Sequence, residues 1–123
     1  MDFALNQAGR NLVVSFVGRV DLEGEESAAF KDRLKALVEQ GADRVVLDLG
    51  NVGFMDSLGL GALISCLKTL KQADGQFVLT NLSESVDSVL RVTRLHRVFD
   101  VRPTVKEALD MLDRLPVAAE RGA

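Results

Sequence analysis

Two different spacings of apolar positions mark the first forty residues, and each spacing predicts a different element. Residues 12–20 are apolar and rich in β-branched side chains, which predicts a strand. Residues 3–7 are a weaker strand candidate, and the turn-forming residues 8–11 between them predict a hairpin. Over residues 27–40 the apolar positions recur three and four residues apart, which predicts a helix capped by the Ser27 hydroxyl.

The middle of the chain twice places a short apolar run before a helical spacing. Residues 45–49 and 77–79 are apolar runs bounded by turn residues, a pattern typical of buried strands. Residues 50–56 predict a loop, after which a helix is expected to begin near Ser57. The apolar positions expected to form the buried stripe of that helix are Leu60, Leu63, Ile64, Leu67 and Leu70.

The last third of the chain predicts two more helices and one strand. Ser83 is placed to cap a third helix, and residues 98–101 are a short strand candidate. Thr104 and Glu107 have the spacing of a capping box before a fourth helix. Residues 116–123 have no periodicity and predict a flexible tail.

The order of these elements, β-β-α-β-α-β-α-β-α, predicts an α/β fold. Strands that alternate with helices are joined by right-handed crossovers and pair in parallel. The opening hairpin adds an antiparallel pair at one edge. We therefore expect a single mixed sheet packed with about four helices.

Composition narrows the class of protein. The chain has 123 residues, of which 47% are hydrophobic and 27% charged, and it suits one globular domain. A net charge of −3 without Trp or Tyr argues against a nucleic-acid groove. The apolar runs are too short to span a membrane, and the N-terminus lacks a secretory pattern. Cys66 is the only cysteine and His96 the only histidine, so we expect no intramolecular disulfide and no bound metal. We also expect no cofactor, and a location in the cytoplasm.

The chemically special positions gather in residues 54–61, at a predicted strand-to-helix junction. In parallel α/β sheets, functional groups lie beyond the carboxyl ends of the strands. A hydroxyl on Ser57 would be exposed there, and a phosphate would be tolerated at the positive end of a helix. Gly59 and Gly61 each lower helix propensity by about 1 kcal/mol, which suggests close approach by another group. Alternatively, Asp56 or Ser57 is only a helix cap and the glycines only admit close helix–strand packing.

Residues 54–63, with the sequence FMDSLGLGAL, resemble the central motif of the STAS-domain anti-sigma factor antagonists. Three further segments resemble this family in the same order along the chain. They are residues 18–21 (GRVD) at the end of its second strand, 45–49 (VVLDL) before its motif, and 95–99 (LHRVF) in its late Leu-x-x-hydrophobic-Phe segment. The resemblance implies a STAS domain over residues 1–115.

This resemblance implies a partner switch. In the family, the serine at the position of Ser57 is phosphorylated by an anti-sigma factor that is also an ATP-dependent serine kinase. The unphosphorylated antagonist binds that protein and frees the sigma factor, the phosphorylated form releases it, and a serine phosphatase restores the first state. The predicted partner-binding residues are Asp21, Asp56, Ser57, Leu58, Gly59 and Gly61.

The chain departs from the family pattern at two places. Arg19 stands where many members have an acidic residue, which would tune the choice of partner. Glu23, Glu25 and Glu26 make the following loop more acidic than in many relatives. A run of charges such as this one is commonly a solvated loop.

Other classes of protein fit less well. An acyl carrier also has Asp-Ser-Leu at a helix start, but carriers are all-helical, whereas this chain predicts strands. A serine hydrolase would need His96 as its base and a Gly-x-Ser-x-Gly elbow, which residues 53–57 do not form. A phosphate-binding loop would need a Gly-Lys-Ser/Thr after the glycines. The remaining alternative is a non-switching STAS subunit of a stress-signalling scaffold or a lipid-transport complex.

Three side chains near the motif carry weaker expectations. Phe54 is expected to anchor the loop in the core, and Met55 to pack at the partner surface. Cys66, close to the apolar stripe of the second helix, is expected to be a small core or boundary residue rather than a reactive thiol.

Overall fold

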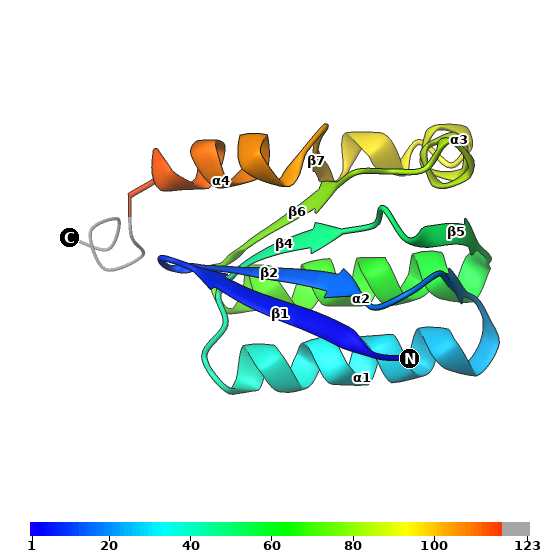
Figure 1. Cartoon of the computed structure of the whole chain (residues 1–123), viewed down its shortest axis with the longest axis horizontal. Coiled ribbons are helices and arrows are strands. Elements are labelled where there is room, and N and C mark those ends of the chain that lie inside the picture. Colours follow the sequence, from blue (N-terminus) through cyan, green and yellow to red (C-terminus); the bar gives the residue numbers. More distant parts are fainter. Residues whose placement is uncertain (117–123) are drawn as a thin grey trace.

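The computed structural model of the chain describes residues 1–116. Its elements, in order, are β1 (Phe3–Ala8), β2 (Asn11–Phe16), β3 (Val20–Leu22), α1 (Gly24–Glu39), β4 (Arg44–Asp48), β5 (Val52–Met55), α2 (Ser57–Gln72), β6 (Gln76–Thr80), α3 (Glu84–Val92), the 3-10 turn η1 (Leu95–Arg97), β7 (Asp100–Arg102) and α4 (Val105–Asp113). The main sheet has the order β1-β2-β4-β6-β7, with β1 and β2 antiparallel and the other neighbours parallel (Figure 1). The predicted mixed α/β fold is confirmed.

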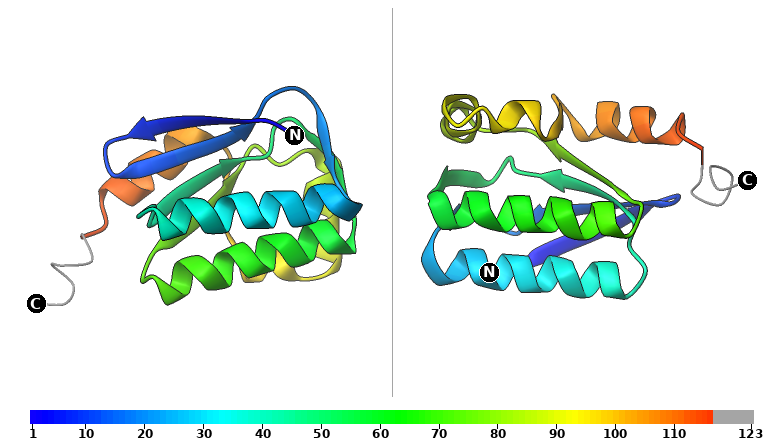
Figure 2. Two further views of the ribbon diagram at one scale, coloured as in Figure 1. Left: turned by 90° about the horizontal axis from the view of Figure 1, so that it is seen from below. Right: turned by 180° about the vertical axis from the view of Figure 1, so that it is seen from behind.

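Helices cover both faces of the main sheet. α1 and α2 lie on one face and α4 lies on the other (Figures 1 and 2). Val45 and Leu47 of β4 point into the core that includes residues of α1 and α2, while Val46 between them packs with Ala108 and Leu112 of α4. Because successive side chains of a strand point to opposite faces, a strand covered on both sides is apolar throughout. This is why the run at residues 45–49 predicted a central strand.

A second, two-stranded sheet pairs β3 with β5 in parallel. The sequence pattern did not predict it: residue 20 was assigned to the preceding strand, and residues 50–56 to a loop. The chain leaves β2 after Phe16 and turns at Gly18, whose φ of +76° does not fit an extended strand. β3 and β5 are so short that neither has a readable period, and their pairing brings together distant parts of the chain.

The helix starts confirm three predicted boundaries and correct a fourth. α2 begins at Ser57, while Ser83 and Thr104 cap α3 and α4 with their hydroxyl oxygens, as predicted. The prediction that Ser27 caps the first helix is wrong, because α1 starts at Gly24 and places Ser27 inside the helix. None of the helices within residues 1–116 has the length and apolar character that a membrane span requires.

The short strand predicted at residues 98–101 is displaced by two residues. η1 occupies Leu95–Arg97, and β7 begins only at Asp100. The amide groups of Val98 and Phe99 still donate to the Leu95 carbonyl, at 2.9 and 3.1 Å, so they belong to the preceding turn. Phe99 is buried against Phe77, which is why this segment is apolar without being extended.

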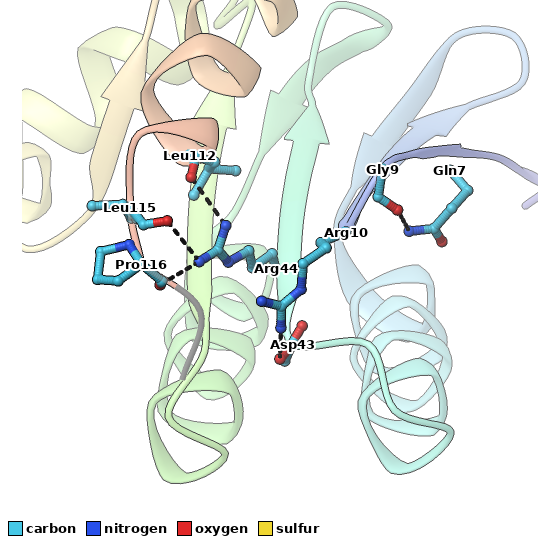
Figure 3. Close-up of polar contacts among 8 residues, drawn as sticks. All are labelled: Gln7, Gly9, Arg10, Asp43, Arg44, Leu112, Leu115 and Pro116. Atoms are coloured by element: carbon cyan, nitrogen blue, oxygen red, sulfur yellow. Dashed lines mark hydrogen bonds and ion pairs between the residues drawn. The ribbon is translucent and has the colours of Figure 1, made fainter. Parts of the chain in front are cut away.

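Arg44, the first residue of β4, holds the C-terminal end of α4 (Figure 3). Its side chain is buried, and its guanidinium donates to the carbonyl oxygens of Leu112 at 3.0 Å, Pro116 at 2.6 Å and Leu115 at 3.4 Å. Carbonyl groups at a helix end lack partners within the helix, and a cation is favourable there. The predicted tail at residues 116–123 lies, beyond Pro116, outside the described residues.

Candidate functional site

The candidate segment lies where β5 runs into α2. Met55 ends β5, Asp56 is the N-cap, and Ser57 is the first residue of α2. β3 pairs with β5 and is followed closely by α1, which begins at Gly24. The first turns of α1 and α2 therefore lie at the same end of the molecule (Figure 1).

Asp56 holds this junction together with one carboxylate. Its Oδ1 accepts hydrogen bonds from the amides of Leu58 at 2.9 Å and Gly59 at 3.0 Å, which caps α2. Its Oδ2 accepts from the amide of Gly24 at 3.4 Å, and so reaches the start of α1. Its own amide donates to the carbonyl of Leu22 at 3.2 Å. The start of α2 is thereby fixed against the junction of β3 and α1.

Because Asp56 is the cap, the Ser57 hydroxyl is not used for capping. Ser57 is exposed, and its side chain makes no hydrogen bond to any part of the chain that the structure describes. The alternative left open by the sequence, in which Ser57 is only a helix cap, is thus settled in favour of Asp56. The hydroxyl is presented to solvent at a fixed place.

The two glycines of the motif have different surroundings. A Cβ on Gly59 would collide with the carbonyl oxygen of Leu22 and lie 2.6 Å from Cγ of Met55. A Cβ on Gly61 would meet nothing within 4 Å. The close approach suggested for both glycines therefore occurs at Gly59 alone, where it lets α2 pack against β3.

The expectations for Phe54 and Met55 are both wrong, because Met55 is buried and Phe54 is exposed. Met55 is 2% exposed and belongs to the main core, whereas Phe54 is 44% exposed. Leu58, directly after the serine, is 58% exposed. Exposed apolar side chains that form a contiguous patch mark interaction surfaces in many proteins. In the sequence, Ser57 is thus flanked by two exposed apolar side chains, Phe54 before it and Leu58 after it.

A groove of about 370 Å³ begins at Ser57 and runs between α1 and α2. The side of α2 contributes Ser57, Leu58, Gly61, Ala62 and Ser65, and the side of α1 contributes Gly24, Ser27, Ala28 and Lys31. Among the described residues that line the groove, Lys31 is the only charged one. The sequence analysis missed Ser27 and Lys31 as site residues, because the groove exists only once the two helices pack. The spacing of four residues from 27 to 31 and from 57 to 61 to 65 is the one signal that they share a face.

Asp21 lies on the strand beside the motif and not in the groove. In the pairing of β3 with β5 it stands opposite Phe54. It lines a separate hollow of about 400 Å³ together with Arg19 and Glu26, and its Oδ1 is buried without a hydrogen-bond partner among the described residues. The guanidinium of Arg19 lies against Gly53, where a Cβ would be 2.8 Å from Cζ. The structure thus brings Asp21 to the site through its neighbour strand.

His96 and Cys66 stand apart from Ser57. His96 lies in η1, with Nδ1 3.4 Å from the carbonyl oxygen of Leu90, and it is absent from the lining of the groove. Cys66 is 3% exposed, as predicted for a core residue, and burial raises the pKa of its thiol from 9.0 to about 12. Neither side chain is placed to act on the serine.

Comparison with known proteins agrees with this geometry. The family model of the STAS domain matches residues 2–108. The chain belongs to the STAS domain family. The anti-sigma-B factor antagonist of Bacillus subtilis is 31% identical over 97 residues, which are 79% of this chain and 86% of that protein.

Solved STAS structures have the same fold. An anti-sigma-factor antagonist (STAS) domain protein of Planctomyces limnophilus is 25% identical with a TM-score of 0.80, and the match covers 92% of this chain and 99% of that one. The Bacillus cell fate determinant SpoIIAA in its phosphorylated form is 23% identical with a TM-score of 0.68, covering 90% of this chain and 99% of that one. This last likeness concerns the fold alone.

Within this STAS domain, five of the six predicted site residues fall into two groups, and the sixth, Asp21, lies on β3 outside the groove. Ser57, Leu58 and Gly61 are exposed around the mouth of the groove. Asp56 and Gly59 lie at the junction and determine where α2 starts and how closely it packs. Asp56 is half-buried and Gly59 is buried.

Proposed function

We propose that this STAS domain is an anti-sigma factor antagonist that works by partner switching. The unphosphorylated form binds an anti-sigma factor that is also a serine kinase, and this frees the sigma factor. Phosphorylation of Ser57 breaks the complex, and a serine phosphatase restores the binding form. The proposal assigns this role to the domain over residues 1–115, acting in the cytoplasm and without catalytic residues of its own.

The observation that supports the proposal most strongly is the hydroxyl of Ser57. It is exposed, it lies at the first residue of α2, and Asp56 holds that residue in place without using the hydroxyl. A kinase can reach such a group without unfolding the helix. The name of the Bacillus subtilis relative, an anti-sigma-B factor antagonist, supports the class of partner.

The exposed side chains of Phe54 and Leu58 support a docking face around the serine. Both are apolar and large, and burying such side chains at the centre of an interface is a common source of binding energy. Gly61 leaves open space beside Ser57, so that a partner side chain could enter the groove. Docking would remove water from the serine.

Charge is the proposed means of release. The γ-phosphoryl group of ATP is transferred to Oγ of Ser57, the hydroxyl proton leaves, and ADP departs. The net charge of the chain falls from −3 to roughly −5. In a desolvated contact this charge has no counter-charge on the bound anti-sigma factor, and a mismatch of this kind across an interface costs about 2–5 kcal/mol of binding free energy. That loss weakens binding by roughly tens-fold to thousands-fold, with no large refolding.

Mass spectrometry tests whether Ser57 is the acceptor. The purified chain is incubated with ATP and an extract of its native cell, and its peptides are analysed for added phosphate. We expect one phosphate on Ser57, and none on a Ser57→Ala chain treated in the same way. Phosphate on another serine, with Ser57 unmodified, would contradict the proposal. Persistent absence of phosphate would favour the non-switching STAS subunit of a scaffold or transport complex.

A further inference from the structure

The groove beside Ser57 contains a cation without a carboxylate partner. Lys31 lines it from α1 and is the only charged residue within residues 1–116 that does so. The salt bridges of the described residues join other pairs, and Lys31 takes part in none of them. It also lines the neighbouring hollow that holds Cys66, and its charge acts on the pKa of that thiol in the lowering direction, so its ammonium lies close to α2.

The same groove contains a buried hydroxyl without a partner. Ser27 is 2% exposed and lines the groove, and its Oγ makes no hydrogen bond to any described residue. A buried polar atom without a hydrogen bond is unfavourable, so such atoms are found where another group completes them. Lys31 and Ser27 lie one helical turn apart on α1, and both face α2.

A phosphoryl group on Ser57 would need neutralisation from beyond its own helix. The amides of Leu58 and Gly59, which could otherwise bind it, already donate to Asp56. Arg19, the other cation at this end, lies against Gly53 and lines the hollow beside Asp21 and Glu26, outside the groove. The other ionisable side chains at this end of α1 and α2 are carboxylates. They are Asp56 before the serine, Glu23, Glu25 and Glu26 at the start of α1, and Asp21 on β3.

We propose that the groove between α1 and α2 receives the phosphoryl group of phosphorylated Ser57, with the Lys31 ammonium as its counter-ion and the Ser27 hydroxyl as a hydrogen-bond donor. The proposal rests on the proposed function only in taking Ser57 as the phosphorylated residue. It adds an internal partner that determines the charge of the phosphorylated state.

The charge of that state determines how sharply the switch acts. The second pKa of a phosphoserine is about 6. Neighbouring carboxylates raise this pKa towards neutral pH, so that part of the phosphate would carry only one negative charge. An ammonium group beside the phosphate has the opposite effect. Lys31 keeps the phosphate doubly charged. Phosphorylation then changes the net charge of the protein by about two units rather than one.

The test measures the phosphate itself. Phosphoserine is installed at position 57 during translation, and its second pKa is measured by a phosphorus-31 NMR titration. Lys31→Met should raise this pKa by about 0.5 unit or more, because a nearby cation favours the doubly charged form. Lys31→Arg should leave it close to the original value.

Lys35→Met is the matched control. It removes the same charge from the same helix one turn further on, and Lys35 lines a neighbouring hollow instead of this groove. It should shift the phosphate pKa far less than Lys31→Met does. Ser27→Ala should also raise the phosphate pKa, by less than Lys31→Met, since it removes a donor to the doubly charged form.

Equal shifts in Lys31→Met and Lys35→Met, or no shift in either, would overturn the proposal. Because the phosphoserine is installed without a kinase, the result does not depend on whether a kinase acts on Ser57. A failed titration would remove Lys31 as the counter-ion and leave the partner switch intact. An absence of phosphorylation in the cell extract would count against the switch and leave the titration result standing.

Discussion

Asp56 is the side chain on which the geometry around Ser57 depends. Its two carboxylate oxygens bind amides at the start of both α1 and α2, and its own amide binds the carbonyl of Leu22. A serine in the same place could cap only one helix. The acid of the motif therefore leaves the neighbouring hydroxyl free, and it also determines where that hydroxyl lies.

Gly59 and Gly61 allow a matched test of this packing. Gly59→Ala should lower the free energy of unfolding by about 1–3 kcal/mol, because its Cβ would collide with the Leu22 carbonyl and with Met55. Gly61→Ala should raise it by about 0.5–1 kcal/mol, because the added methyl group meets open space and alanine favours the helix. Urea denaturation measures both. Similar changes in the two variants would show that α2 does not approach β3 as described.

The thiol of Cys66 offers a second test, since it is the only cysteine. Burial raises its pKa from 9.0 to about 12, so the reactive thiolate is scarce in the folded protein. At pH 8.5, alkylation by iodoacetamide should be at least about a hundredfold slower in the native chain than in the same chain unfolded in urea. Comparable rates would contradict the burial of this side chain.

The same shift gives a direction for the effect of pH on stability. The unfolded chain loses the thiol proton near its ordinary pKa of 9.0, whereas the folded chain retains it to about 12. Above pH 9 the folded state therefore binds more protons than the unfolded state at this group. The contribution of Cys66 to stability is complete below that pH and falls as the pH rises.

For Phe54 and Met55, the sequence pattern gave the wrong prediction of which side chain is buried. Both are apolar, so their pattern alone does not say which one points inward. The choice is made by the pairing of β5 with β3, in which Phe54 stands opposite Asp21 on the strand that the sequence did not reveal. The position of Ser57, which depends on a local cap and the following helix, could be predicted without that pairing.

Helices with a periodic apolar pattern over many residues, and strands that are apolar throughout, could be predicted from the sequence. β4 and β6 are apolar because both of their faces are covered, and α2 has a regular stripe from Leu63 to Leu70. The start of α1 could not be predicted, because its N-cap residue, Glu23, makes no capping hydrogen bond with its side chain. Ser27, by contrast, is of a residue type that commonly caps helices. The groove also escaped prediction, because it belongs to a pair of helices and to neither one alone.

Arg44 and Arg10 allow a comparison between a buried and an exposed arginine (Figure 3). Arg44→Met should lower the free energy of unfolding by about 2–4 kcal/mol, because it leaves the buried carbonyl of Leu112 and the partly buried carbonyl of Pro116 without a donor. Arg10→Met removes only a 3.6 Å ion pair with Asp43 between partly exposed side chains, and should change it by less than about 1 kcal/mol. Thermal or urea unfolding measures both. A small loss in both variants would show that Arg44 does not hold α4 in solution.

The complete fold separates the parts that confer stability from the segment proposed to be phosphorylated. The two cores lie on opposite faces of the main sheet, and Arg44 closes the end of α4 at the beginning of β4. Ser57 lies beyond β5, at the opposite end of the molecule, where the first turns of α1 and α2 meet (Figure 1). A phosphate added there meets exposed side chains and the groove, so the frame need not rearrange.

The proposed control of the complex by Ser57 is tested by the affinity of this chain for an anti-sigma factor, before and after phosphorylation. The anti-sigma factor is recovered from the native cell with the Ser57→Ala chain, purified, and titrated calorimetrically with the unmodified chain and with the chain carrying phosphoserine at 57. Binding to the phosphorylated chain should be weaker by about tenfold to thousandfold. Equal affinities for the two chains would contradict the idea that a charge on Ser57 controls this complex.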